Sequence, residues 1–262
     1  MPKPDDCQVL PFPRLRRFAT DLGFMTRNKL TIRGLVEVDV TKPRQYIREH
    51  KAQTGEARSF TAFLAHCLGA AVDVDKSVHA YQDWRGRLVI FDEVDITIPV
   101  EVETASERFL TGHIVRAANR KNVAAIHDEI RSAQSQSLRR AARETRLLAL
   151  FTILPAPLRR FLLWIIWSNP RASKQVRGTV TLTSVGMFGA RGGWGIGAPS
   201  HTLSIVVGGI AHKPTLVDGH LELHEYLCLT LEFDHDIVDG APAARFTQRL
   251  IELIESGHGL LA

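Results

Sequence analysis

Residues 231–246, Leu231-Glu-Phe-Asp-His-Asp-Ile-Val-Asp-Gly-Ala-Pro-Ala-Ala-Arg-Phe246, join two patterns of different period. An apolar strand pattern runs from Tyr226 to Phe233, and an amphipathic helix pattern runs from about Ala241 to Glu255. The polar corner between them holds His235 and Asp239. A histidine fixed by a strand end and kept accessible by a loop suits a general base. A polar turn with Asp239 as the helix N-cap explains the same spacing.

The motif His-x-x-x-Asp-Gly, with Phe-Asp before it and Gly-Ala-x-Ala-Ala-Arg-Phe after it, fills residues 233–246. It resembles the signature of the catalytic domain of the dihydrolipoyl acyltransferases of 2-oxo acid dehydrogenase complexes, which chloramphenicol acetyltransferase shares. Residues 178–189, Gly-Thr-Val-Thr-Leu-Thr-Ser-Val-Gly-Met-Phe-Gly, are similar to a strand and turn of that family, and residues 37–42 are similar to an early strand. One position differs from the family pattern: these acyltransferases usually carry arginine directly after the histidine, where this chain has Asp236.

The resemblance implies three site residues. His235 is expected to be the general base that removes a thiol proton, a task that suits a side chain with a near-neutral pKa. Thr183 falls on the family's catalytic hydroxyl position, where a donor to the oxyanion is worth about 3 kcal/mol. As an alternative, Thr183 is an ordinary strand residue. Asp239 is expected to hold the loop through an ion pair with an N-terminal arginine, either Arg16 or Arg17.

The strand and helix patterns predict an α/β protein, more narrowly an α+β two-layer sandwich. The resemblance implies the chloramphenicol acetyltransferase-like fold and a homotrimer with active sites between subunits. We expect an N-terminal arm at residues 1–13. Residues 14–262 are expected to form the acyltransferase catalytic domain, with an apolar helical insertion at about 147–168.

The implied function is CoA-dependent transfer of an acyl group between CoA and a dihydrolipoyl-type thiol or another small acceptor. Coenzyme A is expected as a substrate, in the form of acyl-CoA, and no metal is expected. No covalently bound lipoyl group is expected, because Asp75-Lys76 lies at a helix end and not at a hairpin tip of an all-β module. A lipoylated protein would then be supplied in trans. The alternative is a catalytically silent relative that serves as a trimeric assembly core or partner-binding protein.

The amino-acid composition argues against several other functional classes. The chain has 262 residues, 45% hydrophobic, and a formal net charge of +5 from scattered basic residues, which argues against a nucleic-acid interface. Cys7, Cys67 and Cys228 are isolated, so neither a disulfide framework nor a zinc site is indicated. The first residues lack the apolar run of a signal peptide, so a cytoplasmic protein is expected. The glycine pattern at 193–198 precedes a strand pattern, which argues against a Rossmann nucleotide site.

Residues 147–168 form two apolar helical pieces interrupted by Pro155 and Pro157. Neither piece has the ~20 apolar residues of a membrane span. Burial of the second piece would contribute on the order of 10 kcal/mol, too much to leave in water. We expect it to cover its own domain or a neighbouring subunit, with contact to a membrane surface as the less favoured alternative.

The remaining patterns predict most of the other elements. Strands are expected at 30–40, 88–91, 94–102 and 203–210, and helices at 43–51, 60–74 and 120–146. Ser59 is the expected N-cap of the helix at 60–74. A hairpin is expected at 213–223, turning at Asp218-Gly219.

Overall fold

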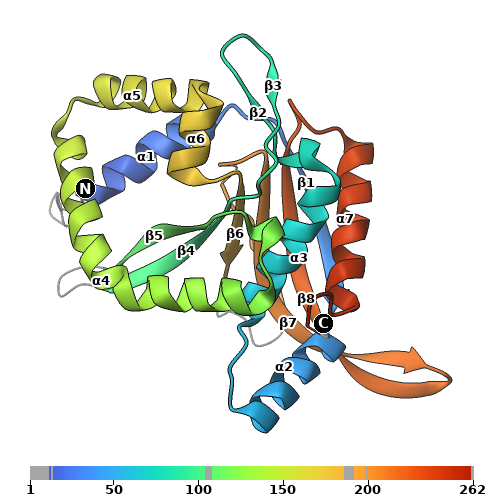
Figure 1. Ribbon diagram of the computed structural model, residues 1–262. Coiled ribbons are helices and arrows are strands. Elements are labelled where there is room, and N and C mark those ends of the chain that lie inside the picture. The colour runs from blue at the N-terminus through green and yellow to red at the C-terminus, as the bar shows by residue number, and fades with distance from the viewer. Residues whose placement is uncertain (1–11, 13, 104–107, 186–191, 199, 261–262) are drawn as a thin grey trace, which may run out of the picture.

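The computed structural model describes residues 12, 14–103, 108–185, 192–198 and 200–260. A six-stranded sheet forms its centre, in the order β1-β8-β7-β6-β4-β5 (Figure 1). The strands are β1 Thr31–Asp39, β4 Ile96–Glu103, β5 Arg108–Val115, β6 Val180–Ser184, β7 Leu203–Val217 and β8 His220–Asp234. β6 lies parallel to β4 and β7, and the other pairs are antiparallel. Two short strands, β2 Tyr81–Gln82 and β3 Leu88–Val89, pair separately.

The helices are α1 Arg14–Thr26, α2 Thr41–Thr54, α3 Phe60–Val74, α4 Val123–Ile153, α5 Ala156–Ser168, α6 Pro170–Arg177 and α7 Gly240–Glu255, with short 3-10 turns η1 Lys76–His79 and η2 Ala118–Arg120. In Figure 1, α3, α4 and α7 lie on one side of the sheet. α3 contacts both α4 and α7, which contact β4 and β1 respectively. The result is the predicted two-layer sandwich of helices on a sheet.

The core lies between these helices and the sheet. Alternate residues of β8, which are Leu227, Leu229, Leu231 and Phe233, are buried against the helices. The Phe233 ring meets Phe246 of α7 edge-on, with 5.9 Å between the ring centroids. Every second residue of β8 and one face of α7 therefore pack into the same apolar layer. This packing fixes the position of the corner that connects the two elements.

Several predicted elements are confirmed at residue level. α3 spans the predicted residues, and the Ser59 hydroxyl accepts a hydrogen bond from the Ala62 amide as an N-cap. The β7–β8 hairpin turns at Asp218 and Gly219, whose φ angles of 48° and 83° are those of a tight hairpin turn. Cys67 and Cys228 are buried, as expected of core thiols.

The apolar insertion is helical, and the described part of this chain covers it on one face. α4 continues to Ile153, the proline-containing break follows, and α5 then packs against α1 and α6. The residues that the structure describes cover the inner face of α5 and leave the hydrophobic side chains of its outer face exposed. No helix of the described residues is both long enough and apolar enough to cross a bilayer.

Candidate active site

The polar corner after β8 is organised by Asp234, whose side chain is buried. Its Oδ2 forms an ion pair with Lys29 Nζ, and its Oδ1 accepts a hydrogen bond from the Asp236 amide at 3.3 Å. Its carbonyl oxygen accepts two more bonds, from the amides of Ile237 at 3.1 Å and Val238 at 2.9 Å. One residue therefore closes the turn with both its backbone and its carboxylate, so the next residue is held in a fixed position.

His235 is that next residue. Its amide donates to the Leu30 carbonyl at 2.8 Å, which ties it to the residue before β1. About one third of the side chain (34%) is exposed. Nδ1 is buried and has no hydrogen-bond partner among the described residues, so the exposed part of the ring presents the opposite edge, which carries Nε2. A substrate proton can therefore be reached through Nε2.

Asp239 lies beside His235, with 3.7 Å between Asp239 Oδ1 and His235 Nδ1. This distance is too long for a hydrogen bond but suits an ion pair when the ring is protonated. Asp239 occupies the N-cap position of α7, yet its side chain makes no capping hydrogen bond. The capping explanation of this motif therefore accounts for the position of Asp239 but not for its carboxylate. Asp236, the departure from the family pattern, is exposed.

Thr183 lies elsewhere in the chain, near the end of β6. It pairs with Val206 of β7, which pairs with Thr230 of β8, five residues before His235. Two strand spacings and five residue rises put Thr183 on the order of 19 Å from His235. A single chain therefore does not bring the candidate base and the candidate oxyanion donor together.

The sheet face away from the helices carries polar groups that sequence reasoning missed. Glu232 is buried there, where its Oε1 accepts from Arg33 Nε at 3.0 Å and from the Gly197 amide at 3.1 Å. Glu232 Oε2, Ser204 Oγ and Thr230 Oγ1 are buried without hydrogen-bond partners among the described residues. Buried polar atoms require partners, so this part of the sheet is suited to water or to a polar part of a ligand.

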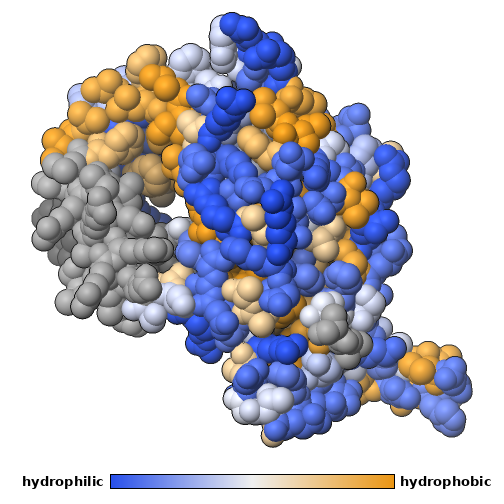
Figure 2. Space-filling view, viewed as in Figure 1, coloured by the Kyte–Doolittle hydropathy of each residue, from blue (hydrophilic) through white to orange (hydrophobic). Residues whose placement is uncertain are grey.

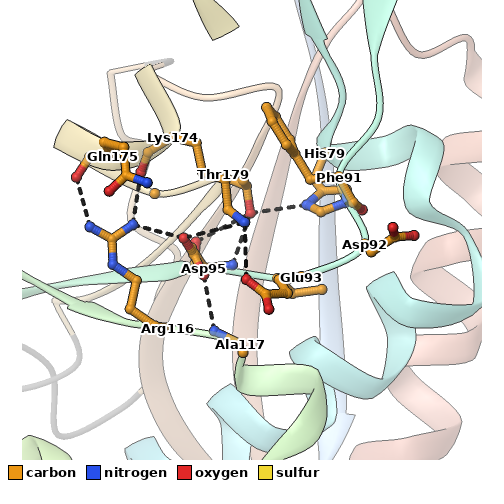
Figure 3. Close-up of polar contacts among 12 residues, drawn as sticks. His79, Phe91, Asp92, Glu93, Asp95, Arg116, Ala117, Lys174, Gln175 and Thr179 are labelled. Carbon is orange, nitrogen blue, oxygen red and sulfur yellow. Dashed lines mark hydrogen bonds and ion pairs between the residues drawn. The ribbon is translucent and has the colours of Figure 1, made fainter. Parts of the chain in front are cut away.

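A buried network holds the start of β6 in place (Figure 3). Arg116 Nη1 donates to Asp95 Oδ2 at 2.7 Å, and Lys174 Nζ lies 3.8 Å from the same oxygen. The Asp95 amide donates to Thr179 Oγ1 at 3.1 Å, and the Thr179 hydroxyl meets His79 Nδ1 at 2.9 Å. The network joins α6, η1 and the residue before β4 to the residue before β6, so it positions the strand that carries Thr183.

Two buried histidines have structural and not catalytic surroundings. Burial lowers the pKa of His79 to about 4, against the opposing effect of its hydrogen bond to the Phe91 carbonyl. Burial, followed by the charge of Arg177, lowers the pKa of His201 to about 3. His201 contacts the Thr181 hydroxyl at 2.7 Å through Nδ1 and the Arg177 carbonyl at 2.6 Å through Nε2. Both rings are neutral at pH 7 and fully enclosed by the fold.

The expected arginine partner of Asp239 is not found within the described part of one chain. Arg16 and Arg17 lie exposed on α1, which packs mainly against α4 and α5. The pairing of Asp239 with either arginine stays a prediction for the assembled protein. Among the residues that the structure describes, no group of three or more His, Cys, Asp or Glu side chains is placed to hold a metal ion.

Comparison with known proteins finds similarity to the 2-oxoacid dehydrogenase acyltransferases. The model of the catalytic domain of the 2-oxoacid dehydrogenase acyltransferases matches residues 170–262. The succinyltransferase component of the 2-oxoglutarate dehydrogenase complex of Staphylococcus saprophyticus is 25% identical over 90% of this chain and 47% of that protein. The acetyltransferase component of the pyruvate dehydrogenase complex of Zymomonas mobilis is 24% identical over 67% of this chain and 33% of that protein. The chain spans less than half the length of these two relatives.

Solved structures agree on the fold. A probable dihydrolipoamide acetyltransferase of Listeria monocytogenes has a TM-score of 0.70 at 19% identity, covering 96% of this chain and 95% of that one. The cubic core of a pyruvate dehydrogenase complex has a TM-score of 0.71 at 18% identity, covering 100% and 99%. The dihydrolipoamide acetyltransferase of Azotobacter vinelandii has a TM-score of 0.71 at 20% identity, with the same coverage. The fold and the resemblance that residues 178–189 and 233–246 indicated are confirmed.

Proposed function

We propose, from the chain's kinship with the 2-oxoacid dehydrogenase acyltransferases, that it is an enzyme that transfers an acyl group between CoA and a thiol or other small acceptor. The observation that carries the proposal is the corner at His235. Its backbone is fixed on both sides, its Nδ1 is buried, and the opposite ring edge is open to a substrate. A base positioned by the strand and left accessible is what removal of a thiol proton requires.

The chemistry follows from these positions. His235 Nε2 takes the proton of the acceptor thiol, and the sulfur attacks the carbonyl carbon of the acyl-CoA thioester. The carbonyl oxygen becomes an oxyanion, to which the Thr183 hydroxyl donates a hydrogen bond. Collapse of this intermediate breaks the bond to the CoA sulfur, and protonated His235 returns the proton to that leaving group. Asp239 lies 3.7 Å from Nδ1, on the side of the ring away from the transferred proton, and so leaves Nε2 free for the substrate.

The enzyme works as a homotrimer in this proposal, with each site shared by two subunits. Thr183 and His235 are too far apart in one chain to act on the same carbonyl. Leu35 shares the sheet face of Thr183 and is exposed, as are Trp194 and Ile196 of the segment 192–198 that lies against Val206 on that face, so a second copy would cover an apolar group here. Threefold assembly would supply His235 of one subunit to Thr183 of the next.

Spacing along the chain supports the residue assignments. The mechanism of the Azotobacter vinelandii enzyme has been examined at a serine, at a histidine 52 positions later and at an asparagine four positions after that. Thr183, His235 and Asp239 are spaced by the same two intervals. In this chain threonine retains the hydroxyl and aspartate replaces the amide, so the donor is kept and a negative charge is added beside the base.

Asp236 does not favour the alternative of a silent relative. Its side chain is exposed, and its amide bonds to Asp234 and leaves the ring of His235 free. The acceptor is proposed to be a dihydrolipoyl group on another protein, met in the cytoplasm. Transfer from acetyl-CoA to free dihydrolipoamide and to a lipoylated domain, compared at equal concentration, distinguishes a small acceptor from a protein-borne one.

Mixing two inactive variants tests the shared site. His235→Ala and Thr183→Ala are each expected to lose acyl transfer while keeping the circular dichroism spectrum and mass of the unmodified protein. Trimers reassembled from an equal mixture are expected to recover about one quarter of the activity, because one interface arrangement in four pairs an intact histidine with an intact threonine. Near-native activity of His235→Ala alone would remove it as the base. Absence of recovery in the mixture would place both residues in one chain's site.

A further inference from the structure

α5 has its polar and apolar faces reversed relative to an ordinary surface helix. Arg159 and Leu163 face the protein and are buried, at 6% and 5% exposure. The opposite face is hydrophobic throughout and exposed, and consists of Leu158, Phe161, Leu162, Trp164 and Ile165. Figure 2 shows a continuous orange area over the part of the surface that α5 occupies in Figure 1. A helix that faces water normally shows the reverse arrangement.

The reversal is fixed by a buried ion pair. Arg159 Nε donates to Asp21 Oδ2 of α1 at 2.6 Å, and Arg160 Nε donates to Asp21 Oδ1 at 3.1 Å. Arg159 also donates to the Leu154 carbonyl at 2.6 Å, just before the helix begins. Rotating α5 to hide its apolar face would expose these bonds and leave Asp21 buried and unpaired. The apolar face is therefore held outward by the fold.

The border of this face carries a net positive charge. No aspartate or glutamate occurs between Glu144 and Asp218, a segment that includes all of α5 and α6. Phe24 of α1 extends the apolar face, and the guanidinium groups of Arg27 and Arg160 lie over its ring at 5.1 and 4.0 Å from the centroid. Asp21, the acidic residue of α1, is buried. Its single negative charge is shared by Arg159 and Arg160, so with Arg27 the border of the exposed hydrophobic residues keeps a net positive charge.

We propose that the outer face of α5 binds an anionic lipid surface, with the helix lying in the plane of the membrane interface. Its hydrophobic side chains enter the acyl region while the bordering arginines meet lipid phosphates. Trp164 and Phe161, stacked with ring centroids 6.0 Å apart, are residue types found at that depth. At 13 residues the helix is about 20 Å long, too short to cross a ~30 Å hydrocarbon core.

A second copy of the chain is a poorer occupant. Packing α5 on α5 about a twofold axis would bring two basic borders together without an acidic partner. Hydrophobicity alone favoured a protein contact for this segment, whereas the basic border favours an anionic lipid surface. Lipid binding by this face does not require the proposed acyltransferase activity.

Vesicle flotation tests the proposal. Unmodified protein is expected to float with phosphatidylcholine vesicles that contain phosphatidylglycerol, and to remain unbound with pure phosphatidylcholine or at high salt. Trp164→Asp/Ile165→Asp is expected to lose flotation. Leu221→Asp/Leu223→Asp is the matched control, because it makes the same charge change at two exposed hydrophobic residues of the β7–β8 hairpin, which Figure 1 shows far from α5. That control is expected to float like the unmodified protein.

Light scattering and circular dichroism accompany each variant, so that loss of binding is not confused with loss of fold or assembly. The proposal is overturned if the unmodified protein stays at the bottom of the gradient with anionic vesicles. It is equally overturned if both variants lose flotation, or if Trp164→Asp/Ile165→Asp lowers the mass of the assembly, which would show a second copy on this face.

Discussion

Replacing Asp21 by asparagine removes the anchor of α5 and tests whether the buried ion pair holds it. Asp21 is 1% exposed and joins two guanidinium groups, one of them 7% exposed. Loss of one partner of such a pair costs about 3–5 kcal/mol, because the remaining charge stays buried. Arg159 keeps its bond to the Leu154 carbonyl, and Arg160 is exposed enough to turn into water. We therefore expect a loss near the lower end, about 3 kcal/mol of unfolding free energy.

The measurement is urea unfolding followed by tryptophan fluorescence, because Trp164 and Trp167 lie on α5. Protein concentration is kept fixed, since assembly contributes to apparent stability. The double variant Asp21→Asn/Arg159→Met is expected to recover about 1–2 kcal/mol relative to the sum of the single variants, the coupling typical of contacting charges. A loss below about 1 kcal/mol for Asp21→Asn, or fully additive single variants, would refute a stabilising anchor.

Three further outcomes are expected. Burial lowers the pKa of His79 to about 4, so between about pH 6.5 and 4 the unfolded chain binds a proton that the folded chain does not, and the free energy of unfolding falls as the pH is lowered, by about 2 kcal/mol at pH 5. In acid titrations followed by circular dichroism, His79→Gln should lose less stability than the unmodified protein, and an unchanged profile would contradict this. Gly178→Ala should lower the free energy of unfolding in urea by at least about 2 kcal/mol, because φ is +71° and the new Cβ would lie 2.7 Å from the Asp95 carbonyl oxygen. Gly34→Ala is the control, since its Cβ would meet open space and should change little; equal effects of the two variants would show the strain to be absent. Light scattering should give a trimer, and a mass near ~24 or ~60 chains would instead indicate a cubic or icosahedral core.

Local signals in the sequence were sufficient where period and turn chemistry agreed. The hydrophobic pattern changes from a strand period to a helix period after Phe233, which predicts the β8 corner and α7. The hairpin turn is predicted at Asp218-Gly219 because a tight hairpin turn needs positive φ angles, which these residue types adopt. β5 was missed, since Arg108–Val115 has no clear alternation and is a strand because β4 lies beside it. A single sequence carries little information about such a neighbour.

The candidate site was predictable only in part, for a related reason. Glu232 interrupts an apolar run, and its partner Arg33 is 199 residues away along the chain. The Asp21–Arg159 pair, which turns the apolar face of α5 outward, joins residues 138 positions apart. His235 and Thr183 are proposed as site residues from their motifs alone. Their separation within one chain became visible only when the strand register was known.

The place of β1 at the edge of the sheet has a consequence for how the protein is made. β1 pairs with β8 alone, and β8 separates it from β7. During synthesis β1 therefore leaves the ribosome nearly 190 residues before the strand that completes it, and β8 inserts between two strands already present. Pairing over such a span is slow and leaves an open strand edge exposed meanwhile. We expect nascent chains that stop before β8 to require a holding chaperone, and Lys29 to reach Asp234 only in the final stage of folding.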